Sequence, residues 1–126
     1  MAHVSACASV ACIASKRDWS DIRLGITCEV TPHHLTFSED YLLGHNWENG
    51  ARLDRLNTST KVNPPLRTEY DRRSLFVELL KGNIDCFATD HALHCDADKN
   101  VLYAQAASGI SNIETALGSL MVLVHR

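Results

Sequence analysis

Residues 84–89 limit the possible folds of this chain more than any other part of its sequence. They read IDCFAT, an almost wholly apolar run that stops abruptly at Asp90 and His91. Such a run is typical of a parallel β-strand that is covered on both faces. Because polar residues follow it directly, the sequence predicts a strand of an α/β fold with polar chemistry at its carboxyl end.

Two earlier segments predict similar units of a strand and a helix. A very short strand ends near His3, and an Ala-rich helix follows it to about Lys16, with Ser5 in position to cap it. Residues 25–31, GITCEVT, form an extended run rich in β-branched residues, and Pro32 ends it because proline cannot continue the hydrogen-bonded ladder. The alternation of short strands with helices favours a parallel sheet.

The middle of the chain predicts a long connection and then a helix. Residues 38–60 are polar and contain several Gly and Asn, and so long a connection inside a compact domain is usually functional or mobile. Residues 61–67, KVNPPLR, are extended because each proline excludes helix at the residue before it. Thr68 and Asp71 resemble a capping box, and apolar residues then recur at helical spacing as far as Gly82.

The last part of the chain predicts a loop and a final helix. The loop runs from about residue 92 to residue 109, and Ser111 and Glu114 then have the spacing of a capping box. The apolar stripe of the helix consists of Ile113, Ala116, Leu117, Leu120 and Leu123. The chain stops at Arg126, inside or just after this helix, so we expect it to be truncated.

Composition excludes several classes of function. The chain has 126 residues, of which 45% are hydrophobic and 21% charged, and its net charge of −3 offers no basic field to nucleic acid. The first fifteen residues lack the basic start and apolar core of a signal peptide, and no apolar run is long enough to span a bilayer. We therefore expect a cytoplasmic protein. Its five cysteines, an odd number without CxxC spacing, indicate neither a disulfide framework nor a zinc knuckle.

Six segments in this order resemble the dihydroorotases. They are AHVS at 2–5, TCEVTPHHL at 27–35, KVNPPLR at 61–67, IDCFATDHALH at 84–94, SGI at 108–110 and ETAL at 114–117. The match runs across almost the whole chain. The blocks TPHH, NPPLR and ATDH in one sequence are highly specific, whereas each alone would be only suggestive.

The resemblance implies a fold and a place within it. The family fold is a (β/α)8 barrel, whose usual length of roughly 250 residues is about twice that of this chain. The motifs look like those of strands six to eight with their helices. We therefore expect an α/β fold that is a partial TIM barrel of the metal-dependent hydrolase type. Residues 1–126 would form the carboxyl-terminal portion of a single amidohydrolase barrel domain.

The reaction that the resemblance implies is the reversible hydrolysis of dihydroorotate to N-carbamoyl aspartate in pyrimidine (UMP) biosynthesis. Water is too weak a nucleophile for an unactivated amide, and a binuclear metal centre lowers the pKa of a bound water and polarises the carbonyl. Zinc suits histidine and carboxylate ligands, so we expect two zinc ions in a complete site. The family's other ligands have no counterpart here, and we expect the chain alone to be inactive.

The resemblance assigns metal ligands to two residues. His3 matches the strand-six histidine that binds one metal, and it would lie at the carboxyl end of a strand, where barrel active sites are assembled. Asp90 matches the strand-eight aspartate, which binds a metal and acts as the general base. A carboxylate that closes an apolar strand is costly to bury without a metal or another partner, which also favours this role for Asp90.

Four further residues are implied to bind substrate. Asn63 matches the asparagine that hydrogen-bonds the pyrimidine ring, and His94 matches a histidine that contacts the substrate carboxylate. Ser108 and Gly109 match a segment whose backbone binds substrate, and Gly109 permits a close approach. The family usually has proline where this chain has Leu93, which loosens the backbone just before His94.

His33 and His34 are adjacent histidines that suggest a metal pair. Adjacent residues of a strand point to opposite faces, so regular β geometry prevents both from binding one ion. The resemblance gives them no ligand role either. We interpret them as structural residues or loop anchors.

Two alternatives to a dihydroorotase stay open. One is a hydantoinase or allantoinase-like cyclic amidohydrolase, against which Asn63 and the NPPLR block argue. The other is a non-catalytic, dihydroorotase-like scaffold for aspartate transcarbamoylase, which Leu93 and the missing ligands leave open. As partners we expect the small-molecule substrate, and either further copies of the chain or aspartate transcarbamoylase, but neither nucleic acid nor a membrane. Association is expected because three barrel strands leave two unpaired edges.

Overall fold

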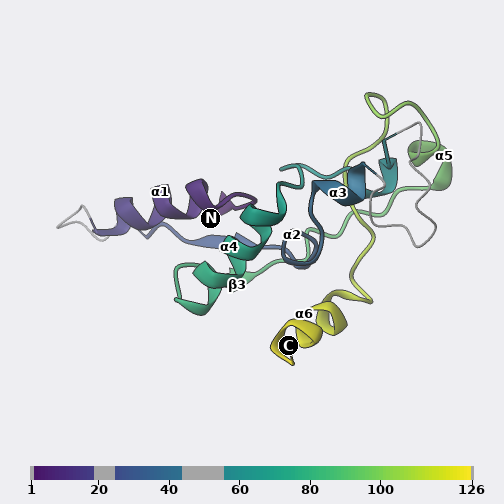
Figure 1. The fold of residues 1–126 in the computed structure, drawn as a ribbon. Coiled ribbons are helices and arrows are strands. Elements are labelled where there is room, and N and C mark those ends of the chain that lie inside the picture. Colours follow the sequence, from purple (N-terminus) through teal and green to yellow (C-terminus); the bar gives the residue numbers. More distant parts are fainter. Residues whose placement is uncertain (1, 19–24, 44–55, 126) are drawn as a thin grey trace.

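Three short strands form one parallel sheet in the order β1, β2, β3 (Figure 1). They are β1 (Ala2–His3), β2 (Cys28–Val30) and β3 (Cys86–Phe87). The computed structural model describes residues 2–18, 25–43 and 56–125, and all three strands lie within these ranges. The α/β arrangement with parallel strands, predicted from the alternation of elements, is confirmed.

β2 and β3 are shorter than the sequence predicts. β2 ends at Val30 because the side chain of Thr31 accepts a hydrogen bond from the His34 N–H and so caps α2 (Pro32–Thr36). β3 covers only two residues of the predicted run 84–89. The prediction that this strand is covered on both faces is wrong, since Cys86 and Phe87 are exposed.

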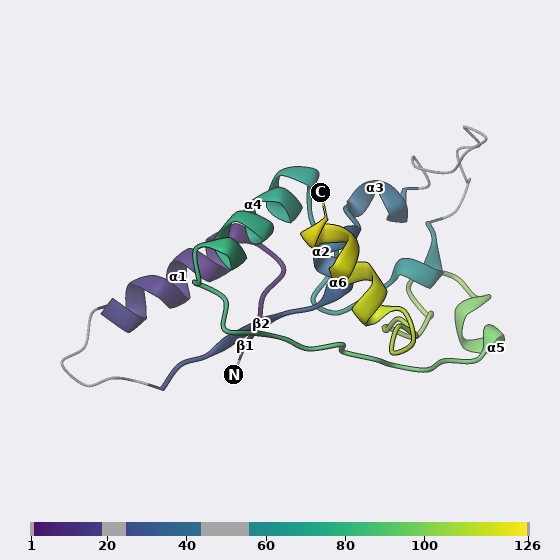
Figure 2. The same cartoon turned by 90° about the horizontal axis from the view of Figure 1, so that it is seen from below.

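Two helices cover one face of the sheet. α1 (Cys7–Asp18) and α4 (Glu69–Leu80) contact each other and lie on the same side of the strands (Figure 2). Between them and the sheet is the core, which consists of Val4, Val10, Cys28, Val30, Leu35, Leu75 and Ile84. Burying an aliphatic side chain of this size contributes about 1.5–3 kcal/mol.

The register of the strands decides which side chains share the other face. His3 pairs with Glu29, and Glu29 pairs with Cys86. Partners in a parallel ladder point to the same face, and successive residues of a strand alternate. Because Cys28 and Val30 point into the core, the His3, Glu29 and Cys86 side chains lie on the face that is turned away from α1 and α4.

α4 forms as its local sequence predicts. The Thr68 side chain accepts a hydrogen bond from the Asp71 N–H at 3.1 Å, which satisfies one of the free donors at the helix start. Leu75 is fully buried. The helix ends at Leu80, and Gly82 follows with a φ of +78°, a conformation that suits glycine.

The predicted starts of the other two long helices are wrong. α1 begins at Cys7, so Ala6 and not Ser5 stands at the position of the cap. α6 (Ala116–Val124) begins five residues after Ser111, the expected cap, with Thr115 before it and no side-chain cap. The reason is a tertiary contact, because the N–H groups of residues 112 and 113 both donate to the imidazole of His91.

The apolar stripe predicted for α6 is only partly buried. Ala116 is buried, and Leu120 and Leu123 pack against the core. Ile113 and Leu117 are 62% and 71% exposed, so they do not belong to that stripe. α6 packs against α2.

Short helices lie in the connections. α3 (Glu39–Leu42) and the 3-10 helix η1 (Thr58–Thr60) lie in the predicted polar connection, of which residues 44–55 are outside the described part. α5 (Asp96–Lys99) lies in the loop that follows β3. No helix in the described ranges has both the length and the apolar character to cross a membrane.

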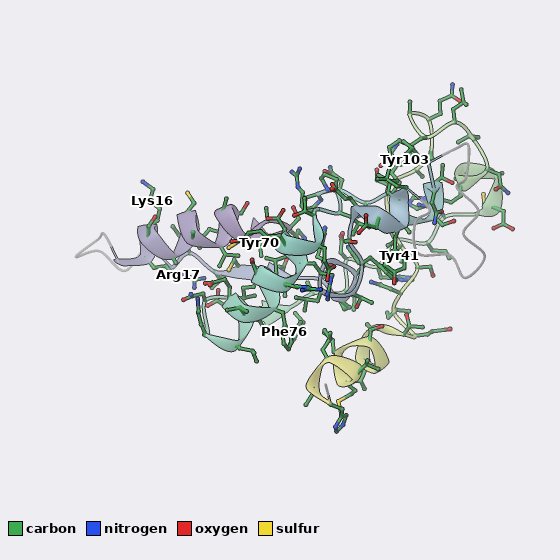
Figure 3. All side chains as sticks on the ribbon, in the orientation of Figure 1. Lys16, Arg17, Tyr41, Tyr70, Phe76 and Tyr103 are labelled. Atoms are coloured by element: carbon green, nitrogen blue, oxygen red, sulfur yellow. The ribbon has the colours of Figure 1, made fainter. Side chains whose placement is uncertain are left out.

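Arg17 ties the end of α1 to the amino ends of β2 and β3 (Figure 3). Its guanidinium donates to the carbonyls of Ile26 at 2.9 Å and Asn83 at 3.1 Å, and it forms an ion pair with Asp85. The Asp85 carboxylate also accepts from the Cys28 N–H at 2.7 Å. This bond is the largest cause of a lowered pKa for Asp85. The tie lies at the end of the sheet opposite the predicted site.

Candidate functional site

His3 stands at the end of β1 and faces Glu29 on β2. Its Nε2 atom lies 3.1 Å from Glu29 Oε1, and the Glu29 side chain is only 11% exposed. A carboxylate that is nearly buried needs a partner, and the imidazole provides one. Sequence reasoning missed Glu29, although one signal was present: it is the only charged residue in the otherwise uncharged run 25–31.

Asp90 lies just after β3 and is half-buried. It adopts a φ of +48°, in the left-handed region that residues with a Cβ rarely enter. The carboxyl ends of parallel strands lie at one edge of a sheet, so Asp90 stands at the same edge as His3.

The buried imidazole of His34 is influenced by the charges of both predicted metal ligands, His3 and Asp90. Burial lowers the pKa of His34, the hydrogen bond to Pro64 and the charge of Asp90 raise it, and the charges of His3 and Arg67 lower it. His3 and Asp90 are therefore both close enough to act electrostatically on one buried imidazole. Both residues lie towards the carboxyl ends of strands in the same sheet.

His33 and His34 lie in α2, so the prediction that they point to opposite faces of a strand is wrong. Both are buried, at 3% and 2% exposure. His34 Nε2 lies 2.9 Å from the Pro64 carbonyl oxygen, and His34 Nδ1 lies 2.7 Å from Thr31 Oγ1. Because a carbonyl only accepts, Nε2 carries the proton and Nδ1 accepts from the hydroxyl. His34 is thus an anchor for the segment that contains Asn63.

His33 is held by α2 against the segment that precedes α6. Its Nδ1 lies 3.3 Å from Asn112 Nδ2. Burial, with smaller contributions from His34 and His3, lowers the pKa of His33 to about 3. His33 is therefore neutral at physiological pH.

The predicted substrate residues after β3 are brought together. His94 Nε2 lies 3.0 Å from the Ser108 carbonyl oxygen. Gly109 is buried with a φ of +140°, and a Cβ there would collide with the Ala92 Cβ and stand 3.0 Å from His94 Nε2. The Gly109 N–H donates to the Lys61 carbonyl at 2.8 Å. Asn63 is exposed two residues further along that same segment.

Two lysines that sequence reasoning missed donate hydrogen bonds to backbone carbonyls of the loop that follows β3. Lys99 Nζ donates to the carbonyls of Ala107 at 2.9 Å and Gly109 at 2.6 Å. Lys61 Nζ donates to the carbonyls of Tyr103 at 2.7 Å and Ala106 at 2.6 Å. Burial, and then the charge of Lys61, lowers the pKa of Lys99. A lysine in a polar loop carries no local signal that distinguishes such a role from a solvated charge.

The donors in the described ranges fit zinc in kind but not in number. His3 offers an imidazole and Asp90 a carboxylate, both of which zinc accepts. His34 uses both ring nitrogens in hydrogen bonds. Among the described residues no group of three or more His, Cys, Asp or Glu could hold a metal ion. These residues by themselves therefore do not complete a metal site.

Known sequences similar to this chain are dihydroorotases. The dihydroorotase of Wolbachia sp. subsp. Drosophila simulans is 42% identical over 123 residues, which are 98% of this chain and 25% of that protein. The dihydroorotase of Desulfotalea psychrophila is 38% identical over 125 residues, which are 99% of this chain and 26% of that protein. The chain thus spans about a quarter of the length of these curated relatives. No family model matches it.

Solved structures similar to this chain include hydantoinases and dihydroorotases. L-hydantoinase (dihydropyrimidinase) from Arthrobacter aurescens has a TM-score of 0.75 and 25% identity, and the match covers 95% of this chain and 24% of that one. The dihydroorotase of Saccharomyces cerevisiae in complex with 5-fluoroorotic acid has a TM-score of 0.74 and 17% identity, covering 99% and 32%.

These neighbours are TIM-barrel amidohydrolases, so the chain has the fold of that class of metal-dependent hydrolases. Within the class, the chain is similar in sequence to dihydroorotases along almost its whole length.

Proposed function

We propose that this chain is the carboxyl-terminal part of a zinc dihydroorotase barrel, contributing strands six to eight, and that it acts within a longer polypeptide. One observation carries the proposal: His3 ends β1 and Asp90 follows β3, so both stand at the carboxyl edge of one parallel sheet. Barrel enzymes assemble their active sites at that edge. The identity of 42% across 98% of the chain supports the same reading.

Each predicted residue has a role in this proposal. His3 and Asp90 contribute two of the ligands of a pair of zinc ions, and the remaining ligands come from outside this chain. Bound zinc supplies Lewis-acid chemistry, which activates water and polarises the amide carbonyl. Asp90 is the general base that takes a proton from the water as its oxygen attacks the amide carbonyl carbon, and it passes that proton to the ring nitrogen as the bond between this carbon and the nitrogen breaks.

The segments around the loop after β3 bind the substrate. Asn63 hydrogen-bonds the ring of dihydroorotate, and His94 contacts its carboxylate. Ser108 and Gly109 offer backbone groups, and the bond from the Gly109 N–H to Lys61 places them beside the segment that carries Asn63. Without the rest of the barrel these residues lack the other metal ligands, so we expect the chain alone to be inactive.

A chimaera tests the proposal. This chain replaces the matching 123-residue segment of the Wolbachia dihydroorotase, and formation of N-carbamoyl aspartate from dihydroorotate is measured. We expect turnover, a loss of about 10²- to 10⁴-fold in kcat with Asp90→Asn, and no turnover without the segment. Unchanged activity of Asp90→Asn, in a variant that keeps its thermal midpoint and its zinc, would overturn the assignment.

A hydantoinase is the second candidate, and the likeness to the L-hydantoinase of Arthrobacter aurescens favours it. The chimaera is therefore also given hydantoin and allantoin. Faster turnover of either than of dihydroorotate would support this alternative. A folded chimaera that takes up no zinc and turns over none of the three would favour the scaffold, and co-purification with aspartate transcarbamoylase would then test it.

Two further parts of the proposal concern the surroundings of the chain. The exposed strand β3 at the edge of the sheet supports association with further copies or with aspartate transcarbamoylase. Metabolism of a small molecule supports a location in the cytoplasm. Size-exclusion chromatography with light scattering measures the first, and cell fractionation measures the second.

A further inference from the structure

Asp90 holds an unusual backbone conformation. Among the described residues it is the only one other than glycine with a positive φ, at +48°. A residue with a Cβ stays in this left-handed region only when its surroundings hold it there. The chain must therefore contain contacts that fix the backbone on both sides of Asp90.

Asn112 makes those contacts. Its side-chain Nδ2 donates to the carbonyl of Thr89, directly before Asp90, at 2.8 Å. Its backbone N–H donates to Nδ1 of His91, directly after Asp90, at 3.1 Å. Asn112, from a different part of the chain, thus forms hydrogen bonds with both neighbours of Asp90. In Figure 1 the yellow-green segment before α6 crosses the chain that follows β3, and His91 and Ile110 form an isolated β-bridge between the two.

The orientation of the Asn112 amide follows from its partners. The Thr89 carbonyl only accepts, so the nitrogen of the amide must face it. His33 Nδ1, 3.3 Å from the same nitrogen, then accepts as well, and the proton of the neutral imidazole lies on Nε2. His33, on α2, therefore accepts a second hydrogen bond from the Asn112 amide and helps to fix its orientation.

The buried pair of His33 and Asn112 does not serve the stability of the fold. His33 and Asn112 are 3% and 6% exposed. His33 Nε2 and Asn112 Oδ1 have no hydrogen-bond partner within the described ranges. Buried polar atoms without partners lower stability, so a reason other than packing is expected for placing this pair beside the candidate active site.

We infer that Asn112, backed by His33, is a positioning residue that sets the place of the Asp90 carboxylate. The inference rests on the proposed function, in which Asp90 is the general base. Neither Asn112 nor His33 touches the substrate in this scheme. Asn112 acts through the Thr89 carbonyl and the His91 imidazole, which together define where the Asp90 side chain starts.

Variants of Asn112 in the chimaera test this. Asn112→Ala removes the side-chain donor, Asn112→Asp keeps the shape but cannot donate to Thr89, and Asn112→Gln keeps an amide. Ser111→Ala is the matched control, because Ser111 is exposed and adjacent. For each variant kcat, KM for dihydroorotate, zinc content and thermal midpoint are measured.

We expect Asn112→Ala to lower kcat about 10- to 100-fold with KM within about twofold, because a small displacement of a reacting group costs rate and not binding. Asn112→Gln should recover part of kcat. If Asn112→Ala does not fold, Asn112→Asp is judged by the same criteria. A kcat within about twofold of the parent, or a loss equal to that of Ser111→Ala, would overturn the inference. Activity that survives Asp90→Asn would instead sink the proposed function, so the two failures are distinguishable.

Discussion

The Nε2 atom of His3 and the Oε1 atom of Glu29 lie 3.1 Å apart across the β1–β2 pair. The two residues are register partners, so the sheet itself brings them together. The contact explains why a nearly buried carboxylate is stable on β2. It also holds the His3 imidazole through Nε2, and the Nδ1 atom takes no part in this contact.

Glu29→Gln is expected to weaken the hold on His3. A carboxylate bonded to a metal-binding histidine orients the ring and raises its basicity, and its loss costs about 10- to 100-fold in metal affinity. Competition of the chimaera with a zinc chelator measures this affinity. Glu39→Gln, at the exposed start of α3, is the control. Equal zinc retention in the two variants would show that Glu29 has no such role.

Gly109→Ala is expected to destabilise the loop after β3. The new Cβ would collide with that of Ala92 and require a φ of +140°. Such overpacking costs about 1–3 kcal/mol. Gly118→Ala is the control, because a Cβ there meets nothing within 4 Å, and alanine in a helix gains roughly 0.5–1 kcal/mol. Urea unfolding of both variants gives the free energies, and similar values for the two would contradict this account.

Arg17→Met is expected to loosen the end of the sheet opposite the site. It removes the bonds to the carbonyls of Ile26 and Asn83 and the ion pair with Asp85, and hydrogen bonds of a charged donor contribute about 1.5–3 kcal/mol. Arg17→Lys should recover only part of the loss, because an ammonium lacks the planar fork. Thermal unfolding measures the effect. Lys81→Met, which breaks only an exposed ion pair, should change the midpoint far less.

The buried His33 is expected to make the chain sensitive to acid. Its pKa is lowered from 6.5 to about 3 in the fold, so the unfolded chain binds a proton that the folded chain does not. Above pH 6.5 the His33 ring is neutral in both the folded and the unfolded chain, so its burial carries no protonation penalty. As the pH falls from 6.5 towards 3, the unfolded chain gains a proton and the free energy of unfolding decreases. The pKa of His34 is also lowered, which adds a loss of the same sign.

Urea unfolding at several pH values between 7 and about 4 measures this slope. His33→Gln should flatten it, since the variant has no proton to bind at that position. His125→Gln, at the exposed end of α6, should leave it unchanged. A slope that is the same in wild type and His33→Gln would contradict the lowered pKa.

Local patterns in the sequence were enough to predict several elements and to reveal the similarity to dihydroorotases. The Thr68 and Asp71 pair, followed by regularly spaced apolar residues, predicts α4, because capping and helical packing act within a few residues. The blocks around His3, Asn63 and Asp90 reveal a similarity to dihydroorotases without any coordinates, and the identity of 42% with one of them agrees with it. The position of His3 and Asp90 at the carboxyl edge of a parallel sheet follows from the alternation of strands and helices.

Only the tertiary structure decided where elements stop and which residues support the site. β2 ends because Thr31 turns to cap α2, and α6 starts late because His91 holds the N–H of Asn112. The partnership of His3 with Glu29, and that of Thr89 with Asn112, joins residues more than twenty positions apart. Local preferences reach only one or two turns of chain, so contacts over such separations exist only once the whole chain has folded.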